Sequence, residues 1–384
     1  MKIGVCKETA ETRVGAVEET VKAFKKNGHE VFVQAGAGVA ADISDENYRQ
    51  AGATVVPSLK ELLATAEVVL KVQAPIAGGD NDEVGQLRSG TVLVATLRPL
   101  TDPALAAKLA AAGVTSFSMD MVPRIARAQS MDVLSSMASV AGYKAVLLAA
   151  NRIGRLMPMM MTAAGTIQPV GVLVIGAGVA GLQAIATARR LGATIKAVDT
   201  RPAVKEQVES LGAKFVPLAV DHQQAQDSGG YAKDLGEEFY RQEQEIVAPH
   251  LKGCSVVICT AQIPGRKAPV LITEAMVKTM LPGSAIIDIA APYGGNCSLT
   301  KLGQWVEAYG VSVYGPENLP AEMPAMSSTL YSRNIATFLN ELIKDGKVNL
   351  DMNNEVIKGM LITHEGKIVN EATLKALERQ GGKP

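Results

Sequence analysis

Apolar and polar positions along the first third of the chain repeat with two periods, one typical of strands and one typical of helices. The predicted strands span residues 2–6, 30–36, 67–75 and 91–97, and the predicted helices span 18–27, 59–66 and 103–112. The last two strands are continuous apolar runs, which indicates that both of their faces are buried. Strands that alternate with helices in this way form a doubly wound, parallel α/β sheet.

The residues at the ends of these helices agree with the periodic pattern. Ser58 and Glu61 have the spacing of a capping box, and Asp102 with Pro103 supplies an N-cap and a first helical residue. Gly28 follows the first predicted helix, where glycine commonly ends a helix. Local chemistry and periodicity therefore predict the same helix boundaries.

A second series of strands and helices begins near residue 135. Residues 141–156 are almost wholly apolar, which predicts a helix buried between two domains. The segment "MMMTAAGTIQP" at 159–169 predicts a hairpin whose methionines serve core packing or a dimer contact rather than a ligand. The alternation of strands and helices then continues to about residue 320.

Near the C-terminus, apolar residues recur at the spacing of an amphipathic helix. They occupy positions i, i+3, i+4 and i+7 as Ile335, Phe338, Leu339 and Leu342. We expect this helix and the tail after it to return to the first domain. The predicted domains are residues 1–134 plus 327–384, and residues 135–326, each with a Rossmann-like sheet.

One long polar segment, residues 219–248, interrupts the second series. A connection of that length inside a compact domain is usually functional or disordered. Its sequence "SGGY" combines flexible glycines with an aromatic side chain. We therefore predict a lid that closes over a ligand.

Composition narrows the class of protein. The 384 residues are too many for one ordinary core and favour two domains. Lys plus Arg number 38, as do Asp plus Glu, so no net charge attracts nucleic acid or anionic lipid. The four cysteines have neither zinc nor disulfide spacing, which suits a reducing cytoplasm, and we expect no metal. We also expect no apolar run as long as the roughly 18–20 residues of a membrane helix.

A glycine motif, Gly176, Gly178 and Gly181, follows a predicted strand and opens a predicted helix. The first glycine allows a tight turn, the second admits a pyrophosphate, and the third lets the helix pack closely. Asp199 ends the next strand, where a carboxylate accepts hydrogen bonds from an adenosine ribose. A 2′-phosphate would meet like charge there, which favours NAD over NADP. Arg201 keeps NADP open, because arginine can accommodate that phosphate.

Several longer motifs accompany the glycine motif. They are "PRIARAQSMDVLSS", "PMMMTAAGTIQP", "ATARRLGA", "KEQVESLGAKF", "GGYAK", "TAQIPGRKAPVLIT" and "GGNC". With them the chain closely resembles, over nearly its whole length, the NAD(H)-binding alpha subunit of proton-translocating NAD(P) transhydrogenases. The resemblance implies hydride transfer from NADH to NADP+ on a partner subunit, coupled to proton flow by a membrane-spanning subunit. It also implies a homodimer held at the cytoplasmic face of the membrane through those partners.

The resemblance implies which residues form the site. A loop beside the nicotinamide carries Arg, Gln and Asp in that family, matched here by Arg124, Gln129 and Asp132, and Ser135 matches a serine that contacts the carboxamide. The other implied dinucleotide contacts are Ser130, Met131, Gly176, Gly178, Val179, Ala180, Gly181, Asp199, Thr200, Arg201, Glu243 and Gln262, and the mobile loop that closes on the nucleotide supplies Gly230 and Tyr231.

Two positions depart from the family pattern. Glu243 lies where some relatives have Gln, and Pro292 lies where many carry Glu. The remaining site residues suit hydride transfer, because this chemistry needs oriented nicotinamides and excluded water rather than an acid–base histidine. Taken without the resemblance, Ser130 or Asp132 would be interpreted as the cap of a surface helix.

Two other functions remain open from the residues. Alanine dehydrogenase has a similar two-domain architecture, and its substrate Arg and Lys match Arg13 and Lys71. Arg98, however, stands where that enzyme has its catalytic His, and an amino-acid dehydrogenase needs that proton acceptor. A non-catalytic NAD-binding redox sensor is the second alternative, and the loop of Arg124, Gln129 and Asp132 argues against it.

Overall fold

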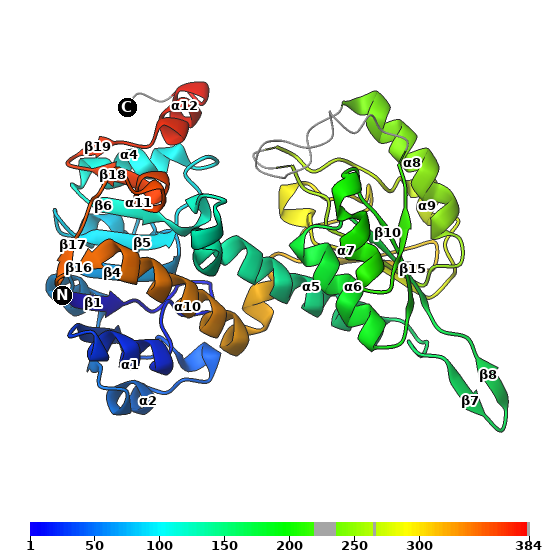
Figure 1. The fold of residues 1–384 in the computed structure, drawn as a ribbon, viewed down its shortest axis with the longest axis horizontal. Coiled ribbons are helices and arrows are strands. Elements are labelled where there is room, and N and C mark those ends of the chain that lie inside the picture. Colours follow the sequence, from blue (N-terminus) through cyan, green and yellow to red (C-terminus); the bar gives the residue numbers. More distant parts are fainter. Residues whose placement is uncertain (219–235, 264–265, 382–384) are drawn as a thin grey trace. The chain divides into compact units, whose positions relative to one another are not determined.

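The computed structural model describes residues 1–218, 236–263 and 266–381 (Figure 1). The chain divides into two compact units, Met1–Met137 with Ala321–Pro384, and Ala138–Pro320. We refer to these as the first and second units. The predicted α/β class with two mostly parallel sheets is confirmed.

The first unit is built on an eight-stranded sheet with the order β19-β18-β6-β5-β4-β1-β2-β3. Its strands are β1 (Lys2–Val5), β2 (Glu30–Gln34), β3 (Thr54–Val56), β4 (Val68–Gln73), β5 (Val92–Thr96), β6 (Thr115–Ser118), β18 (Leu361–His364) and β19 (Lys367–Ile368). Strands β1 to β6 pair in parallel, whereas β18 runs antiparallel to β6 and β19 antiparallel to β18. Segments from both ends of the chain thus share one sheet.

Helices cover both faces of this sheet. They are α1 (Glu18–Lys26), α2 (Asp45–Gln50), α3 (Leu59–Thr65), α4 (Pro103–Ala111), α10 (Pro324–Leu342), α11 (Glu355–Met360) and α12 (Glu371–Arg379). In β5, Val92 and Val94 join the core that includes α1 and α10, whereas Leu93 joins the core that includes α3 and α4. Alternate residues of one strand therefore serve opposite faces, which explains its continuous apolar run.

The second unit contains a seven-stranded sheet with the order β11-β10-β9-β12-β13-β15-β14. Its strands are β9 (Gly171–Ile175), β10 (Thr194–Val198), β11 (Lys214–Val216), β12 (Val256–Cys259), β13 (Ser284–Asp288), β14 (Trp305–Ala308) and β15 (Val311–Tyr314). Only β14 runs antiparallel to its neighbour among these described strands. The order along the sheet reverses between β9 and β12, and such a reversal opens a ligand crevice at the carboxyl ends of the strands.

Helices α6 (Val179–Arg190), α7 (Lys205–Ser210), α8 (Glu237–Leu251) and α9 (Glu274–Val277) belong to this unit. Val172 and Val174 of β9 pack in a core with α6, whereas Leu173 and Ile175 pack in a core with α8 and α9. Two cores on opposite faces of a parallel sheet are what a doubly wound fold requires.

Helix α5 (Val133–Arg152) is longer and less buried than the sequence predicts. It begins before residue 141 and ends before 156, and Leu134 and Tyr143 are exposed. Among the described residues it is the helix whose length and mean hydropathy of 1.5 would allow a membrane span, so the expectation of no such run is wrong. We interpret α5 as a core helix, because its buried alanines pack in the second unit's core with α6.

Two further expectations are corrected. Ser58 accepts from the Glu61 N–H at 3.3 Å, but the Glu61 carboxylate accepts from the Ser58 hydroxyl at 3.5 Å, so the reciprocal half of a capping box is not formed. Part of the expected polar loop is helical, because residues from 237 onward form α8. A run with charged residues on one side and Tyr240, Val247 and Leu251 on the other is amphipathic, and this decided the structure.

The Met-rich hairpin forms, but core packing does not explain it. Strands β7 (Met160–Thr162) and β8 (Gly165–Ile167) pair antiparallel and project from the second unit (Figure 1). Met159, Met161 and Ile167 are exposed, Met161 to 78%. Of the two predicted roles for these methionines, only a contact with another chain is left.

Candidate functional site

The glycine motif forms the turn between β9 and α6, and two of its glycines are required by space. Gly176 has a φ of +90°, and a Cβ there would lie 2.6 Å from the Thr260 hydroxyl oxygen. A Cβ at Gly181 would lie 1.8 Å from the Gly176 carbonyl oxygen. Any side chain at either position would push helix α6 away from the turn.

Gly178 differs from the other two because it faces open space. It is the N-cap of α6, and among described atoms a Cβ there would meet only the Arg201 Nη2, at 4.0 Å. Val179, the first helical residue, is 42% exposed, and Ala180 and Gly181 follow it in the first turn. Free N–H groups and the positive end of the helix dipole therefore face an accessible space, the arrangement that binds a pyrophosphate.

Helix α5 supports this turn from behind. A Cβ at Gly142 would lie 2.1 Å from the carbonyl oxygen of Ala180, so α5 approaches the start of α6 as closely as backbones allow. Thr260 supports it from the next strand, because its hydroxyl donates to the Gly176 carbonyl at 2.8 Å. Sequence patterns singled out neither Gly142 nor Thr260, since both act on a segment that is distant along the chain.

Asp199 follows β10 and is only 6% exposed. Its Oδ2 accepts from the Ala177 N–H at 2.7 Å and from the Arg201 Nη2 at 2.8 Å. Its Oδ1 accepts from the Arg201 N–H at 2.8 Å and the Arg201 Nε at 2.9 Å. The carboxylate thus joins the glycine turn to Arg201, and Thr200 lies between the paired residues, half-buried. A ribose hydroxyl would bind Asp199 by replacing or sharing one of these bonds.

Glu243 lies on α8 and is 4% exposed. Burial, and in second place the charge of Asp199, raises its pKa to about 8. Near neutral pH this side chain is therefore a carboxylic acid, which donates one hydrogen bond and accepts others as an amide does. This gives a physical reason why relatives with Gln at this position can share the same site. Gly230 and Tyr231, the expected lid residues, lie outside the described residues.

The loop that resembles the nicotinamide loop belongs to the first unit. Residues Ala126–Met131 form a 3₁₀ turn, and Arg124, Gln129 and Ser130 are exposed while Met131 is buried. The returning helix α10 anchors this turn, because the Asn334 Nδ2 donates to the Ser130 carbonyl at 2.8 Å. The exposed polar side chains are thus held on a backbone that is fixed from below.

Asp132 and Ser135 are brought together at the start of α5. The Asp132 Oδ1 accepts from the Ser135 N–H at 2.9 Å, and its Oδ2 accepts from the Ser135 hydroxyl at 2.6 Å. Asp132 therefore caps α5, as its residue type alone suggests. A cap of this kind also fixes the direction of the Ser135 side chain, so the two roles are compatible.

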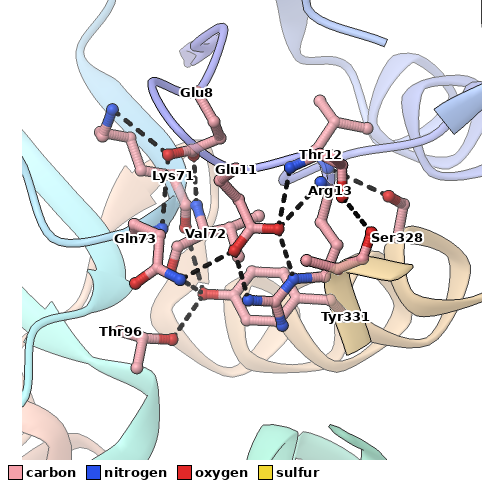
Figure 2. Close-up of polar contacts among 12 residues, drawn as sticks. Glu8, Glu11, Thr12, Arg13, Lys71, Val72, Gln73, Thr96, Ser328 and Tyr331 are labelled. Atoms are coloured by element: carbon pink, nitrogen blue, oxygen red, sulfur yellow. Dashed lines mark hydrogen bonds and ion pairs between the residues drawn. The ribbon is translucent and has the colours of Figure 1, made fainter. Parts of the chain in front are cut away.

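A polar cluster fills the carboxyl ends of β1, β4 and β5 in the first unit (Figure 2). Arg13 is 7% exposed, and its Nε and Nη2 donate to the two carboxylate oxygens of Glu11 at 2.9 and 2.7 Å. Lys71 is 3% exposed and lies 2.9 Å from Glu83 and 3.5 Å from Glu8. The two residues that match an amino-acid site therefore already have carboxylate partners within the chain.

The electrostatics of this cluster follow from burial and pairing. Burial raises the pKa of Glu8 in spite of Lys71, whereas the hydrogen bonds and charge of Arg13 outweigh burial and hold the pKa of Glu11 at about 2. Tyr331 of α10 donates to the Lys71 carbonyl at 3.1 Å. The sequence analysis missed Tyr331 and the three glutamates, and only the known position of Arg13 and Lys71 would have suggested a search around them.

Comparisons with known proteins cover the whole chain. The family "Alanine dehydrogenase/PNT" matches with its N-terminal domain over residues 4–141 and its C-terminal domain over residues 145–371. An NAD(P) transhydrogenase alpha subunit of Rhodospirillum rubrum is 46% identical, over 97% of this chain and 98% of that one. A crystal structure of a transhydrogenase from Sinorhizobium meliloti superimposes with a TM-score of 0.86 at 42% identity, over 96% of this chain and 100% of that one.

Alanine dehydrogenase is a more distant relative. The enzyme of Mycobacterium tuberculosis is 29% identical, over 97% of this chain and 95% of that protein. The two kinds of relative thus match nearly the same length of chain, and the difference lies in the level of identity.

Proposed function

The chain belongs to the alanine dehydrogenase/PNT family, and from this membership we propose that it is the NAD(H)-binding component of a proton-translocating NAD(P) transhydrogenase. The observation that carries the proposal is a full-length likeness to transhydrogenase alpha subunits in a chain with an open glycine turn. Hydride passes from NADH on this chain to NADP+ on a partner subunit, with Si/Re specificity. A membrane-spanning subunit couples this step to proton translocation.

The residues of the second unit suit NAD(H). The open face of Gly178 and the N-terminus of α6 would hold the pyrophosphate, and Asp199 would accept from the adenosine ribose. Arg201 is paired with Asp199 through its guanidinium, so a 2′-phosphate would have to break that pair and approach a carboxylate. This supports NAD over NADP and answers the doubt that Arg201 raised. Glu243 and Gln262 complete the proposed contacts.

In the proposed mechanism the loop of the first unit orients the reacting ring. NADH supplies the hydride, so the protein groups need to align and shield it rather than transfer a proton. Arg124 and Gln129 are exposed and available to contact the nucleotide, while Asp132 holds Ser135 in place for the carboxamide. Ser130 and Met131 supply the adjoining backbone. The domain division 1–134 with 327–384, and 135–326, is part of this proposal.

An alanine dehydrogenase activity is the second candidate, and three observations oppose it. Arg98 occupies the position of the catalytic His. Arg13 and Lys71, the residues for a substrate carboxylate, are paired with Glu11, Glu8 and Glu83. A non-catalytic redox sensor, the third candidate, would bind NADH without supporting hydride transfer in any complex.

The proposed assembly is a homodimer on the cytoplasmic face of the inner membrane, attached through its partner subunits. The exposed hairpin β7–β8 supports a contact between chains, because its methionines and Ile167 form an apolar surface. Sedimentation of the purified chain before and after changing Met161 to Lys tests the dimer. An unchanged dimer would move the contact to another surface.

A single series of assays separates the three functions. The purified chain is mixed with NAD and alanine, and separately with NADH, an NADP+ analogue and an NADP-binding partner domain. We expect no oxidation of alanine, and hydride transfer only when the partner domain is present. Robust transfer by the chain alone would contradict its role as one component, and no transfer with the partner would favour the sensor.

A further inference from the structure

The motif "GGNC" at residues 294–297 has no role in the mechanism above. Its Asn296 is fully buried, yet each polar atom of its side chain has a partner. The Oδ1 accepts from the Ala261 N–H at 3.0 Å, and the Nδ2 donates to the carbonyls of Ala261 and Pro269, both at 2.9 Å. An acceptor and two donors at this spacing are what an amide supplies and what a carboxylate or an alkyl group does not.

Asn296 is itself held by the end of β13. Asp288 is fully buried, and its Oδ2 accepts from the N–H groups of Asn296 and Cys297 at 2.7 and 3.0 Å and from the Thr300 hydroxyl at 2.7 Å. Gly295 has a φ of +79°, and a Cβ there would lie 2.8 Å from the Asp288 Oδ2. The backbone around Asn296 is therefore wrapped around a buried carboxylate and has little freedom to move.

The segment that Asn296 holds lies directly beside the glycine turn. Ala261 stands between Thr260, which donates to the Gly176 carbonyl, and Gln262, which is exposed. The Thr260 N–H also donates to the Ile175 carbonyl at 2.8 Å. Residues 260–262 are thus fixed to the glycine turn on one side and to Asn296 on the other. An exposed side chain next to two such anchors has a defined starting point.

We propose that Asn296 is a positioning residue that sets Gln262 at the nucleotide site through the backbone of Ala261. Asn296 does not touch the nucleotide, and Asp288 fixes it in turn. The inference rests on the proposed function, because it takes NADH as the ligand that Gln262 contacts. It adds a residue that determines affinity from a distance.

The test compares NADH affinity in variants of the purified full chain. Asn296→Asp keeps the size and the acceptor but places a second carboxylate oxygen against the Ala261 and Pro269 carbonyls, so residues 260–262 must shift. We expect the NADH dissociation constant to rise about tenfold, the size of one lost hydrogen-bonded contact. Asn151→Asp, the same change at an exposed position of the second unit, is the control and should leave affinity unchanged.

A double-mutant cycle shows whether Asn296 acts through Gln262. Gln262→Ala, an exposed substitution, should weaken NADH binding by a similar factor, and the double variant should be no weaker than either single variant. Trp305, the single tryptophan, stacks on Tyr314 in the same unit at 4.7 Å, so its fluorescence reports whether that unit is folded.

The outcomes separate the two proposals. Failure of the wild-type chain to bind NADH would overturn the proposed function itself. Normal binding by Gln262→Ala, or by a folded Asn296→Asp, would overturn the positioning role alone, and so would fully additive losses in the double variant. An Asn296→Asp chain that does not fold leaves the result for Gln262→Ala to decide.

Discussion

Both units end their parallel strands in a set of charged and polar groups, but the two ends differ in what they leave available. In the first unit, Glu11 pairs with Arg13, and Glu8 and Glu83 flank Lys71, so cations and carboxylates satisfy one another. In the second unit, Asp199 and Arg201 also pair, yet the N-terminus of α6 beside Gly178 faces open space.

The difference teaches how a site is recognised in a parallel sheet. Both edges have the topology that hosts ligands, because loops at the carboxyl ends of strands converge there. Topology is therefore not sufficient, and the electrostatic balance decides. A buried Lys71 that already has two carboxylates gains little from a third, whereas free backbone N–H groups at a helix start gain a partner when a phosphate binds.

The largest expected effect tests whether the cluster of the first unit is structural. Lys71→Met would leave Glu8 and Glu83 buried without their cation, which should lower the free energy of unfolding by about 3–5 kcal/mol. Chemical unfolding of both chains measures it. Arg241→Met removes an exposed arginine that also lies between two carboxylates, and it should change stability little. Equal stability of the Lys71 variant and the wild type would mean that the cluster is free to bind an external ligand.

The next effect concerns Glu243 and depends on pH. The pKa of Glu243 is about 8 in the folded protein and 4.5 as its ordinary value, so the unfolded chain loses this proton first as pH rises. This contribution should therefore lower the stability between about pH 4.5 and pH 8, by at most about 1.4 kcal/mol per pH unit.

Glu243→Gln tests this reasoning, because the amide resembles the protonated acid and does not ionise. The variant should match the wild type below pH 4.5 and exceed it in melting temperature at pH 8. Glu238→Gln, an exposed change on the same helix, is the control. Parallel curves for Glu243→Gln and the wild type across this range would show that Glu243 is ionised in the fold.

A third prediction addresses the exposed loop of the first unit. Gln129→Asn keeps the amide but withdraws it by one methylene, and errors of about 1 Å in the placement of reacting groups can cost ~100-fold in rate. We expect that loss in single-turnover hydride transfer by the complex with its NADP-binding partner, at nearly normal NADH affinity. Gln50→Asn, at an exposed position of the same unit, should transfer hydride normally. A wild-type rate for Gln129→Asn would leave the loop as a helix start only.

The smallest effect tests the choice of nucleotide. Asp199→Ala should weaken NADH binding by ~1.5–3 kcal/mol, the worth of hydrogen bonds to a charged group. The same change frees Arg201, so NADPH should bind more tightly than it does to the wild type. Titration with both nucleotides measures this, and adding Arg201→Ala should remove the gain. Equal affinities of the wild-type chain for NADH and NADPH would contradict the assignment of NAD.

Much of the fold could be predicted because its signals are local. The apolar runs of β4 and β5 and the Asp102 cap of α4 lie within a few residues of the structure they specify. The predictions that went wrong depended on surroundings. The extent of α5 was wrong because its polar first turn is stabilised by Asp132, and the Met-rich hairpin was wrong as a core element because nothing in its own pattern distinguishes a core from a contact surface.

The sequence by itself determined the elements, the glycine motif and the family resemblance, since periodicity, turn chemistry and motif spacing act along the chain. The tertiary structure decided which charges cancel and which groups stay open. Lys71 meets Glu83 within a loop's reach but meets Glu8 only because β1 and β4 are neighbours, and Asn296 meets Ala261 only because β12 and β13 are neighbours. Hydrogen bonds and ion pairs depend on distance in space, and one sequence contains no record of which distant residues will share an edge.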